Sequence, residues 1–157
     1  MTKVMFVCHG NICRSPMAEF IFKYMLRKLG AEDDFEVASS ATSREEIGND
    51  MYPPAKRKLR EKGIPFSRRC ARQFDIADYK HYDYIFIMER YNFVNLCRII
   101  RDDTEGKVHL LTEYSDFGSD IADPWYSGNF DVTYDEIFES CKCFLAHLGY
   151  DVSKLQA

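Results

Sequence analysis

The chain has 157 residues, of which 46% are hydrophobic and 15% aromatic. This length predicts one domain spanning residues 1–157, because domains usually contain roughly 100–200 residues. The apolar content suffices for a core, which excludes a disordered chain or a repeat array. With 21 lysine and arginine against 25 aspartate and glutamate residues, the formal net charge is -4. No overall positive field is therefore available to bind nucleic acid, and any bound anion must be held by a local site.

The apolar segments are too short to place the chain in a membrane or to direct its export. The N-terminal apolar stretch covers only residues 4–7, and no later run approaches ~18 residues. We therefore expect a cytoplasmic protein that does not contact membranes, and we expect it to be a monomer. Cysteines stay reduced in that compartment. We therefore expect all six cysteines to be free thiols: Cys8, Cys13, Cys70, Cys97, Cys141 and Cys143.

The first predicted elements are a strand, a loop and a helix. Residues 3–7 form a β-rich apolar run, and from Pro16 onward the apolar residues recur with the spacing of one helix face. Ser15 is predicted to be the N-cap of this helix, and Gly30 is predicted to end it. The segment between the strand and the helix is the predicted loop.

Three further strands and two helices follow. Residues 35–39, 83–88 and 107–111 are predicted strands, and the last two are continuous apolar runs typical of strands buried on both faces. A short basic helix is predicted over residues 53–59, introduced by two prolines. A helix of about a dozen residues is predicted to begin at Arg90.

The last predicted helix runs from about residue 131 to residue 148 and ends before Gly149. Thr133 and Glu136 are predicted to form a capping box at its start. Strands that alternate with helices pair in parallel through right-handed crossovers. The predicted fold class is therefore α/β, with a doubly wound four-stranded parallel sheet and helices on both faces. Ligands bind beyond the carboxyl ends of such strands, which draws attention to the loop after the first strand.

This loop has the residue types and the spacing of an oxyanion-binding site. It contains a Cys-x5-Arg-Ser pattern, in the run Cys8-His9-Gly10-Asn11-Ile12-Cys13-Arg14-Ser15. A loop of this length can direct several backbone N–H groups at one anion, and the following helix adds its positive end. Gly10 and Asn11 tolerate unusual backbone angles, and Arg14 supplies a planar fork matched to two phosphate oxygens.

The same positive groups act on Cys8. A cysteine that faces a guanidinium, backbone amides and a helix N-terminus is favoured as the nucleophilic thiolate. Ser15 is placed to donate a hydrogen bond to this sulfur when a covalent intermediate breaks down. We therefore expect the loop to supply a reactive thiolate at neutral pH without a histidine base.

A second motif lies far along the chain, in Asp123-Pro124-Trp125-Tyr126. Together with residues 7–19, the chain length and the strand–loop–helix order, it makes the chain resemble the low-molecular-weight protein tyrosine phosphatases over essentially its whole length. The resemblance implies the flavodoxin-like phosphotyrosine phosphatase I fold and no metal or other cofactor. It also implies hydrolysis of tyrosine-phosphorylated proteins and small aryl phosphates through a phosphocysteine, with inorganic phosphate or a similar oxyanion binding in the loop.

The resemblance further implies a role for each site residue. Cys8 attacks phosphorus, Arg14 holds the phosphoryl oxygens, and Asp123 protonates the leaving phenol and then activates water. Trp125 and Tyr126 form a wall for the substrate ring. The other implied positions bind phosphate or support the loop: His9, Gly10, Asn11, Ile12, Cys13, Ser15 and Ser39. From the residues alone the role of Asp123 stays open, since Asp-Pro pairs also form ordinary turns.

The chain departs from the family pattern at several positions. His9 follows the nucleophile where small or apolar residues are usual, and Arg69 lies near the usual place of a loop-supporting histidine. Glu45 stands where animal members often have an aromatic residue at the rim. The supporting network and the choice of substrate are therefore left open by the sequence.

Three alternative functions are weighed against a tyrosine phosphatase. An arsenate reductase of this fold needs an extra cysteine after the third strand, but here that strand ends in Met88 and Cys97 lies further along. A protein arginine phosphatase is associated with threonine at the position of Ile12. A silent phosphate-binding module would need neither Cys8 nor Asp123, so the presence of both favours an enzyme.

Overall fold

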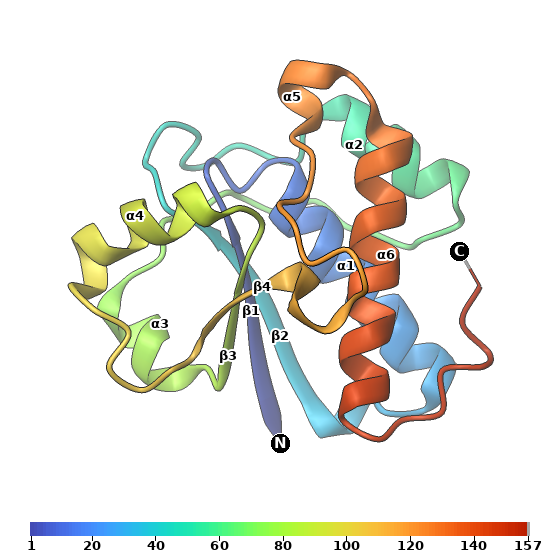
Figure 1. Ribbon diagram of the computed structural model, residues 1–157. Coiled ribbons are helices and arrows are strands. Elements are labelled where there is room, and N and C mark those ends of the chain that lie inside the picture. The colour runs from blue at the N-terminus through green and yellow to red at the C-terminus, as the bar shows by residue number, and fades with distance from the viewer. Residues whose placement is uncertain (157) are drawn as a thin grey trace.

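Four parallel strands form one sheet, with helices packed on either side of it (Figure 1). The computed structural model describes residues 1–156, so Ala157, the last residue of the predicted domain, lies outside the described residues. The strand order is β2-β1-β3-β4. The strands are β1 (Thr2–Cys8), β2 (Phe35–Ala41), β3 (Tyr84–Ile87) and β4 (Val108–Leu110). The predicted α/β class and the four-stranded parallel sheet are confirmed.

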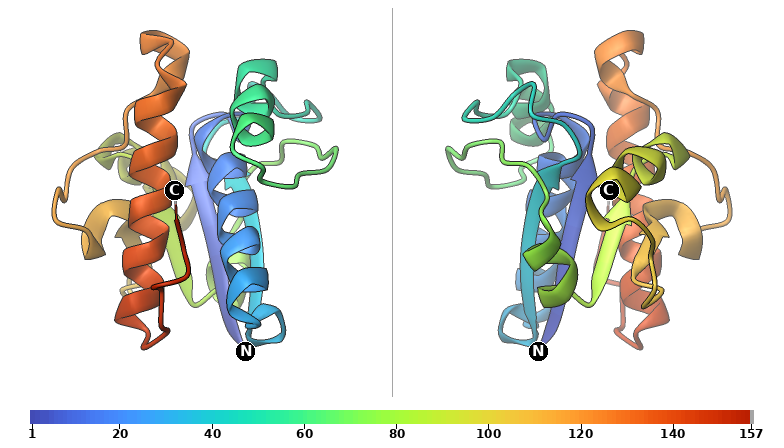
Figure 2. Two further views of the ribbon diagram at one scale, coloured as in Figure 1. Left: turned by 90° about the vertical axis from the view of Figure 1, so that its right-hand side faces the viewer. Right: turned by 90° about the vertical axis from the view of Figure 1, so that its left-hand side faces the viewer.

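The helices cover both faces of the sheet (Figure 2). One face carries α1 (Arg14–Leu29) and α6 (Phe130–His147), which pack against each other, with α2 (Pro53–Glu61) beside α6. The other face carries α3 (Ile76–His81) and α4 (Arg90–Ile100). Three shorter helices complete the chain: η1 (Glu32–Asp34), η2 (Leu111–Tyr114) and α5 (Pro124–Ser127).

Both faces of the sheet are buried, which explains why the central strands are apolar throughout. Side chains alternate along β1, so Val4 and Phe6 enter the core shared with α1 and α6, while Met5 and Val7 enter the core shared with α3 and α4. In the first core Phe6 stacks on Phe86 of β3, with ring centroids 5.9 Å apart. The parallel pairing brings the carboxyl ends of the strands to one edge, where the loops that follow them meet.

Helix α1 begins earlier than its apolar spacing indicates. Its first residue is Arg14, and its N-cap residue, Cys13, makes no side-chain cap hydrogen bond. The prediction of Ser15 as the N-cap is wrong, because its hydroxyl lies within the first turn and contacts the sulfur of Cys8 at 3.0 Å. The first N–H groups of α1 therefore have no side-chain cap from Cys13, and a helix start left open in this way can bind an anion. Gly30, with a φ of 66°, ends the helix as predicted.

The predicted capping box at the start of the last helix is also wrong. Asn129 caps α6 by accepting a hydrogen bond from the N–H three residues later at 3.2 Å. Thr133 donates instead to the carbonyl of Ala122 at 2.8 Å, and Glu136 accepts from the N–H of Ala122 at 3.0 Å. The two side chains thus fasten the residue before Asp123 to α6.

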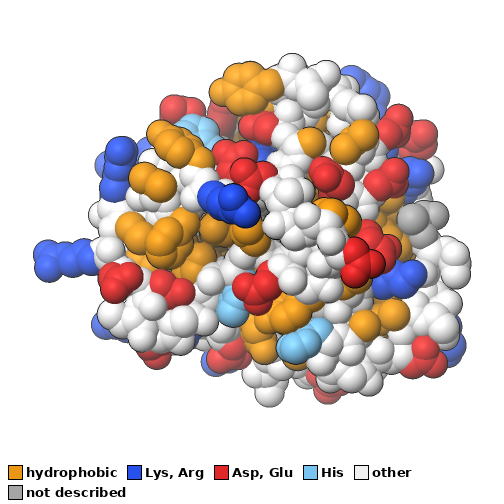
Figure 3. Space-filling view, in the orientation of Figure 1, with side chains coloured by type: hydrophobic (Ala, Val, Ile, Leu, Met, Phe, Trp, Pro, Cys, Tyr) orange, Lys and Arg blue, Asp and Glu red, His pale blue; other side chains and the backbone are white. Residues whose placement is uncertain are grey.

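The other predicted helices and strands are confirmed, with small differences at their ends. The expected burial of the strand at residues 107–111 is wrong, because β4 is an edge strand whose residues are only partly buried. Periodicity does not reveal α3 and α5, because runs of 6 and 4 residues are too short for a helical repeat to show. Within residues 1–156 no helix is long and apolar enough to cross a membrane. On the face drawn in Figure 3, lysine and arginine side chains are scattered among acidic ones and do not gather in one patch.

Candidate active site

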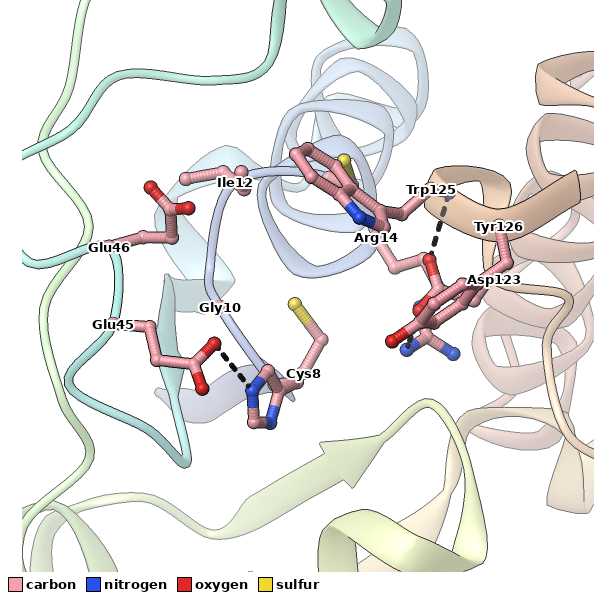
Figure 4. Close-up of a pocket in the computed structure, with 11 residues that line it drawn as sticks. Cys8, Gly10, Ile12, Arg14, Glu45, Glu46, Asp123, Trp125 and Tyr126 are labelled. Atoms are coloured by element: carbon pink, nitrogen blue, oxygen red, sulfur yellow. Dashed lines mark hydrogen bonds and ion pairs between the residues drawn. The ribbon is translucent and has the colours of Figure 1, made fainter. Parts of the chain in front are cut away.

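The loop of residues 8–15 joins β1 to α1 and borders a cavity of about 250 Å³ (Figure 4). One wall of this cavity comes from the segment after β2, and the opposite wall comes from the residues around α5. The lining residues are Cys8, His9, Gly10, Ile12, Cys13, Arg14, Glu45, Glu46, Asp123, Trp125 and Tyr126. The fold therefore brings the two sequence motifs together, although more than a hundred residues separate them.

Cys8 is the last residue of β1, and its sulfur faces the cavity (Figure 4). The Sγ atom lies 3.0 Å from Ser15 Oγ, and the backbone N–H of Asn11 donates a hydrogen bond to it at 3.3 Å. Two polar groups and the N-terminal end of α1 thus surround the sulfur. The contact between Ser15 and the sulfur, expected from the sequence, is present.

Arg14 is a buried cation, only 2% exposed, whose partners are two carboxylates and a carbonyl. Its Nη1 donates to Glu89 at 2.9 Å and to the carbonyl of Ile121 at 3.0 Å, and its Nη2 donates to Asp123 at 3.3 Å. Burial lowers the pKa of Arg14, but Cys8 and the two carboxylates outweigh this effect and raise it overall. Its Nε has no partner among the described residues. A buried N–H without a protein partner is suited to a ligand oxygen.

Glu89 belongs to this site, although it is not among the residues predicted from the sequence. It is the N-cap residue of α4, and its side chain is 25% exposed where it meets Arg14. The signal that points to it is its place shortly after the buried strand β3, at the carboxyl edge of the sheet. An acidic residue there balances part of the charge of the buried guanidinium.

Asn11 holds the loop in its shape. Its φ is 58°, in the left-handed region that residues other than glycine rarely adopt. Its Nδ2 donates to Ser15 Oγ at 2.8 Å and to Ser39 Oγ at 3.0 Å. Ser39 donates in turn to Glu19 of α1 at 2.6 Å. The structure thus joins Asn11, Ser15 and Ser39 in one hydrogen-bond network, and their role in supporting the loop stays a prediction.

Arg69 completes this network, at the place where the resemblance leads one to expect a histidine. Its Nη2 donates to Asn11 Oδ1, and the backbone N–H of Arg72 donates to the same oxygen at 3.3 Å. The backbone N–H of Arg69 is itself held by Asp50 at 3.2 Å. Both the oxygen and the nitrogen of the Asn11 amide are therefore hydrogen-bonded. An arginine in place of the usual histidine thus keeps the supporting network intact.

Replacement of Asn11 by alanine is expected to lower the free energy of unfolding by about 1–3 kcal/mol, because the strained φ is kept while the amide hydrogen bonds are lost. Asn11→Gly loses the same hydrogen bonds but adopts a positive φ freely. The difference in stability between the two variants therefore reports the backbone strain, and the loss that they share reports the hydrogen bonds. Urea unfolding measures the stability of both variants. A stability of Asn11→Ala equal to the wild type would contradict a supporting role.

Asp123 is the N-cap residue of α5 and lies at the cavity wall. Its Oδ1 accepts a hydrogen bond from the N–H of Trp125 at 3.0 Å, and its Oδ2 meets Arg14 at 3.3 Å. The turn favoured by an Asp-Pro pair is present, and it is this turn that presents the carboxylate to the cavity. The structural and the functional interpretations of Asp123 are therefore compatible.

The two walls of the cavity differ in character (Figure 4). Trp125 and Tyr126 form an aromatic wall and are 53% and 86% exposed. Trp125 packs on Tyr52 of the neighbouring segment, with ring centroids 4.8 Å apart. On the opposite wall, His9 Nε2 lies 2.9 Å from Glu45 Oε2. His9 is thus held by an acidic side chain that the family pattern does not predict.

Two further loop residues have clear surroundings. Cys13 is buried, and this burial, with the nearby Cys8, raises the pKa of its thiol, which stays neutral. At Gly10 an added Cβ atom would lie 3.4 Å from the Glu46 side chain, which is an ordinary van der Waals distance. Across residues 1–156, no group of three histidine, cysteine, aspartate or glutamate side chains is placed to hold a metal ion.

Comparisons with known proteins extend over nearly the whole chain. The family model described as low molecular weight phosphotyrosine protein phosphatase matches residues 3–154. A low molecular weight phosphotyrosine protein phosphatase of Schizosaccharomyces pombe is 37% identical over 157 residues, which covers 95% of this chain and 100% of that protein.

Solved structures agree with these matches. The crystal structure of YfkJ from Bacillus subtilis has a TM-score of 0.90 and 35% sequence identity, and the match covers 94% of each chain. The crystal structure of a Drosophila arginine phosphatase has a TM-score of 0.85 and 31% identity, covering 96% of this chain and 99% of that one. By sequence, fold and the oxyanion loop, this chain belongs to the low molecular weight phosphotyrosine protein phosphatase family.

Proposed function

We propose that this protein hydrolyses phosphotyrosine in protein substrates, and small aryl phosphates, through a phosphocysteine formed on Cys8. One observation carries the proposal: the Cys8 sulfur, with two hydrogen-bond partners, faces the same cavity as the buried Arg14 and the carboxylate of Asp123. A nucleophile, an anion clamp and a proton carrier are thus within one site. The single domain of residues 1–157, the monomeric state and the cytoplasmic location stay predictions from the sequence.

In the first step the phosphoryl group lies in the loop, where backbone N–H groups and Arg14 hold its oxygens. The dianion takes over the Arg14 nitrogen that Asp123 contacts in the free protein. The Cys8 thiolate attacks phosphorus, so an S–P bond forms while the bond to the phenolic oxygen breaks. Asp123 in its acid form donates a proton to that oxygen, and the phenol leaves.

In the second step water cleaves the phosphocysteine. The Asp123 carboxylate takes a proton from the water as its oxygen bonds to phosphorus, and the S–P bond breaks. The electron pair returns to the Cys8 sulfur, where the hydrogen bond from Ser15 stabilises the departing thiolate. The products are inorganic phosphate and the free enzyme, so the cycle needs no redox partner.

Phosphate release from p-nitrophenyl phosphate and from a phosphotyrosine peptide, with a reductant and a metal chelator present, tests this proposal. We expect turnover with both substrates, and acid quenching during turnover is expected to trap phosphate on Cys8, where mass spectrometry of the peptides locates it. Absence of turnover in the intact protein, with phosphate still raising the unfolding temperature, would indicate a binding module instead.

Replacement of Asp123 by asparagine is expected to lower kcat by about 10²–10⁴-fold, because the leaving phenol loses its proton donor. The loss is expected to be largest for substrates whose phenol is a poor leaving group and small for those with a good one. Measuring kcat across a series of substituted aryl phosphates checks this. A loss of equal size for every leaving group would assign Asp123 a role other than acid catalysis.

The match to an arginine phosphatase makes a second substrate worth testing. At the loop position where threonine is associated with arginine phosphatases, this chain has Ile12, whose aliphatic side chain lines the cavity. Such a side chain makes no hydrogen bond to a guanidinium, so phosphoarginine would leave polar groups unpaired there. We therefore expect a phosphotyrosine peptide to have a higher kcat/KM than the matching phosphoarginine peptide, and the reverse order would reassign the substrate but not the mechanism.

A further inference from the structure

The wall of the cavity opposite Trp125 and Tyr126 is acidic. Glu45 and Glu46, from the segment that follows β2, both line the cavity (Figure 4). The Glu45 side chain is 70% exposed and projects at the mouth rather than into the core. We call these two residues the acidic wall. The acidic wall lies beside the phosphate loop, because Glu45 contacts His9, the loop residue next to Cys8.

Neither carboxylate of the acidic wall has a permanent cation as its partner among the described residues. Glu45 meets His9, an imidazole that is 45% exposed. Glu46 accepts a hydrogen bond from the neutral amide of Asn49 at 2.6 Å. Arg14, the cation that lines the cavity, is 2% exposed and is engaged by Glu89 and Asp123. The mouth of the cavity is therefore negative while its floor is built for an anion.

This arrangement is unfavourable for the phosphoryl group alone, because carboxylates near the mouth repel a dianion. The floor supplies the attraction that the phosphoryl group needs, through Arg14 and the uncapped start of α1. Charges at the edge of a site act mainly on the parts of a ligand that stay outside it. The part of a phosphotyrosine substrate that stays outside is the peptide on either side of the phosphorylated residue.

We propose that the acidic wall selects phosphotyrosine segments that carry lysine or arginine next to the phosphotyrosine. A basic side chain beside the bound residue reaches Glu45 or Glu46, whereas an acidic one in the same place meets like charges. The inference rests on the proposed phosphatase function and adds a substrate class to it. Glu45 and Glu46 are specificity residues in this scheme and do not take part in bond making or breaking.

The test compares two phosphotyrosine peptides that differ only in having lysine or glutamate on both sides of the phosphotyrosine. The quantity measured is the ratio of kcat/KM for the basic peptide to that for the acidic peptide. We expect a ratio of about three to ten at low ionic strength, since exposed ion pairs are individually weak. The ratio is expected to approach one in ~1 M salt, where the Debye length is about 3 Å.

Charge reversal of the wall gives the decisive comparison. The double variant Glu45→Lys with Glu46→Lys is expected to bring the ratio below one, and the neutral pair Glu45→Gln with Glu46→Gln is expected to bring it close to one. A ratio cancels any general change in activity, so the result does not require the variants to turn over as fast as the wild type. The glutamine pair keeps the size of both side chains, so it replaces the lysine variant as the test if the lysine variant folds poorly.

A matched control is Asp33→Lys with Glu32→Lys, which changes the net charge by the same amount. Both residues belong to η1, which precedes β2 and so lies at the opposite edge of the sheet from the cavity. These control substitutions are expected to keep the wild-type ratio. A control that shifts the ratio as much as the wall variants would overturn the proposal, because the effect would then come from total charge.

The outcomes separate this inference from the proposed function. If p-nitrophenyl phosphate and both peptides are hydrolysed, but with a ratio of one that Glu45→Lys with Glu46→Lys leaves unchanged, the phosphatase function stands and the acidic wall has only a structural role. If neither peptide nor p-nitrophenyl phosphate is hydrolysed, the proposed function itself fails. A ratio that is above one in the wild type and reversed in the wall variant supports the substrate class.

Discussion

Replacement of Cys8 by serine is expected to lower kcat for aryl phosphates by at least about 10⁴-fold. A serine hydroxyl has nearly the same shape but stays protonated at neutral pH, so no anionic nucleophile faces phosphorus. The partners of the sulfur, Ser15 and the N–H of Asn11, are left in place. Single-turnover phosphate release measures the loss, and a rise of the unfolding temperature with phosphate shows that the variant still binds the anion.

The matched control is Cys97→Ser, the same chemical change on α4 and outside the cavity. It is expected to keep the wild-type kcat. If the wild type reduces arsenate, loss of that activity in Cys97→Ser would assign a thiol relay to Cys97. Turnover by Cys8→Ser above about a hundredth of the wild-type rate would contradict a phosphocysteine mechanism.

Replacement of Arg14 by lysine is expected to lower kcat/KM by about 10²–10³-fold, mainly through kcat. Lysine keeps the positive charge beside Glu89 and Asp123, so neither carboxylate is left facing an empty site. It lacks the planar fork, and the unpaired Nε of Arg14 has no equivalent in lysine. The oxygens of the phosphoryl group then lose directed donors as charge shifts between them during transfer.

The control for this variant is Arg27→Lys, the same substitution at the exposed last turn of the same helix. It is expected to leave both kinetic constants as in the wild type. Urea unfolding of Arg14→Lys shows whether the activity loss comes from lost stability. A folded Arg14→Lys protein with kcat/KM within about tenfold of the wild type would contradict a directed phosphate clamp.

The phosphate loop is predictable from the sequence because its function depends on contiguous residues. The Cys-x5-Arg-Ser spacing places the nucleophile at the end of a strand and the guanidinium at the start of a helix, and both follow from local pattern. The N-cap is the exception, because Ser15 has a competing partner in Cys8 that a capping rule does not take into account. Thr133 and Glu136 fail as a capping box for the same reason, since the backbone of Ala122 binds them.

Other site residues are not predictable from local pattern. Glu89 and Glu46 have no motif of their own, and they belong to the site because parallel strands end at one edge of the sheet. Arg69 takes part through a side chain that reaches Asn11 from a segment 58 residues away. Such contacts depend on how loops pack, and a single sequence carries no direct signal for them.

By itself the sequence of this protein determined the α/β order of its elements, the oxyanion loop and the residue types for covalent phosphoryl transfer. Hydrophobic period and short-range spacing express these features, because they depend on neighbours along the chain. Only the tertiary structure decided which side chains from distant segments meet the loop. Asp123 contacts Arg14, Arg69 contacts Asn11, and Glu45 contacts His9. The physical reason is that hydrogen bonds and ion pairs act over a few ångströms in space, and the fold sets those distances.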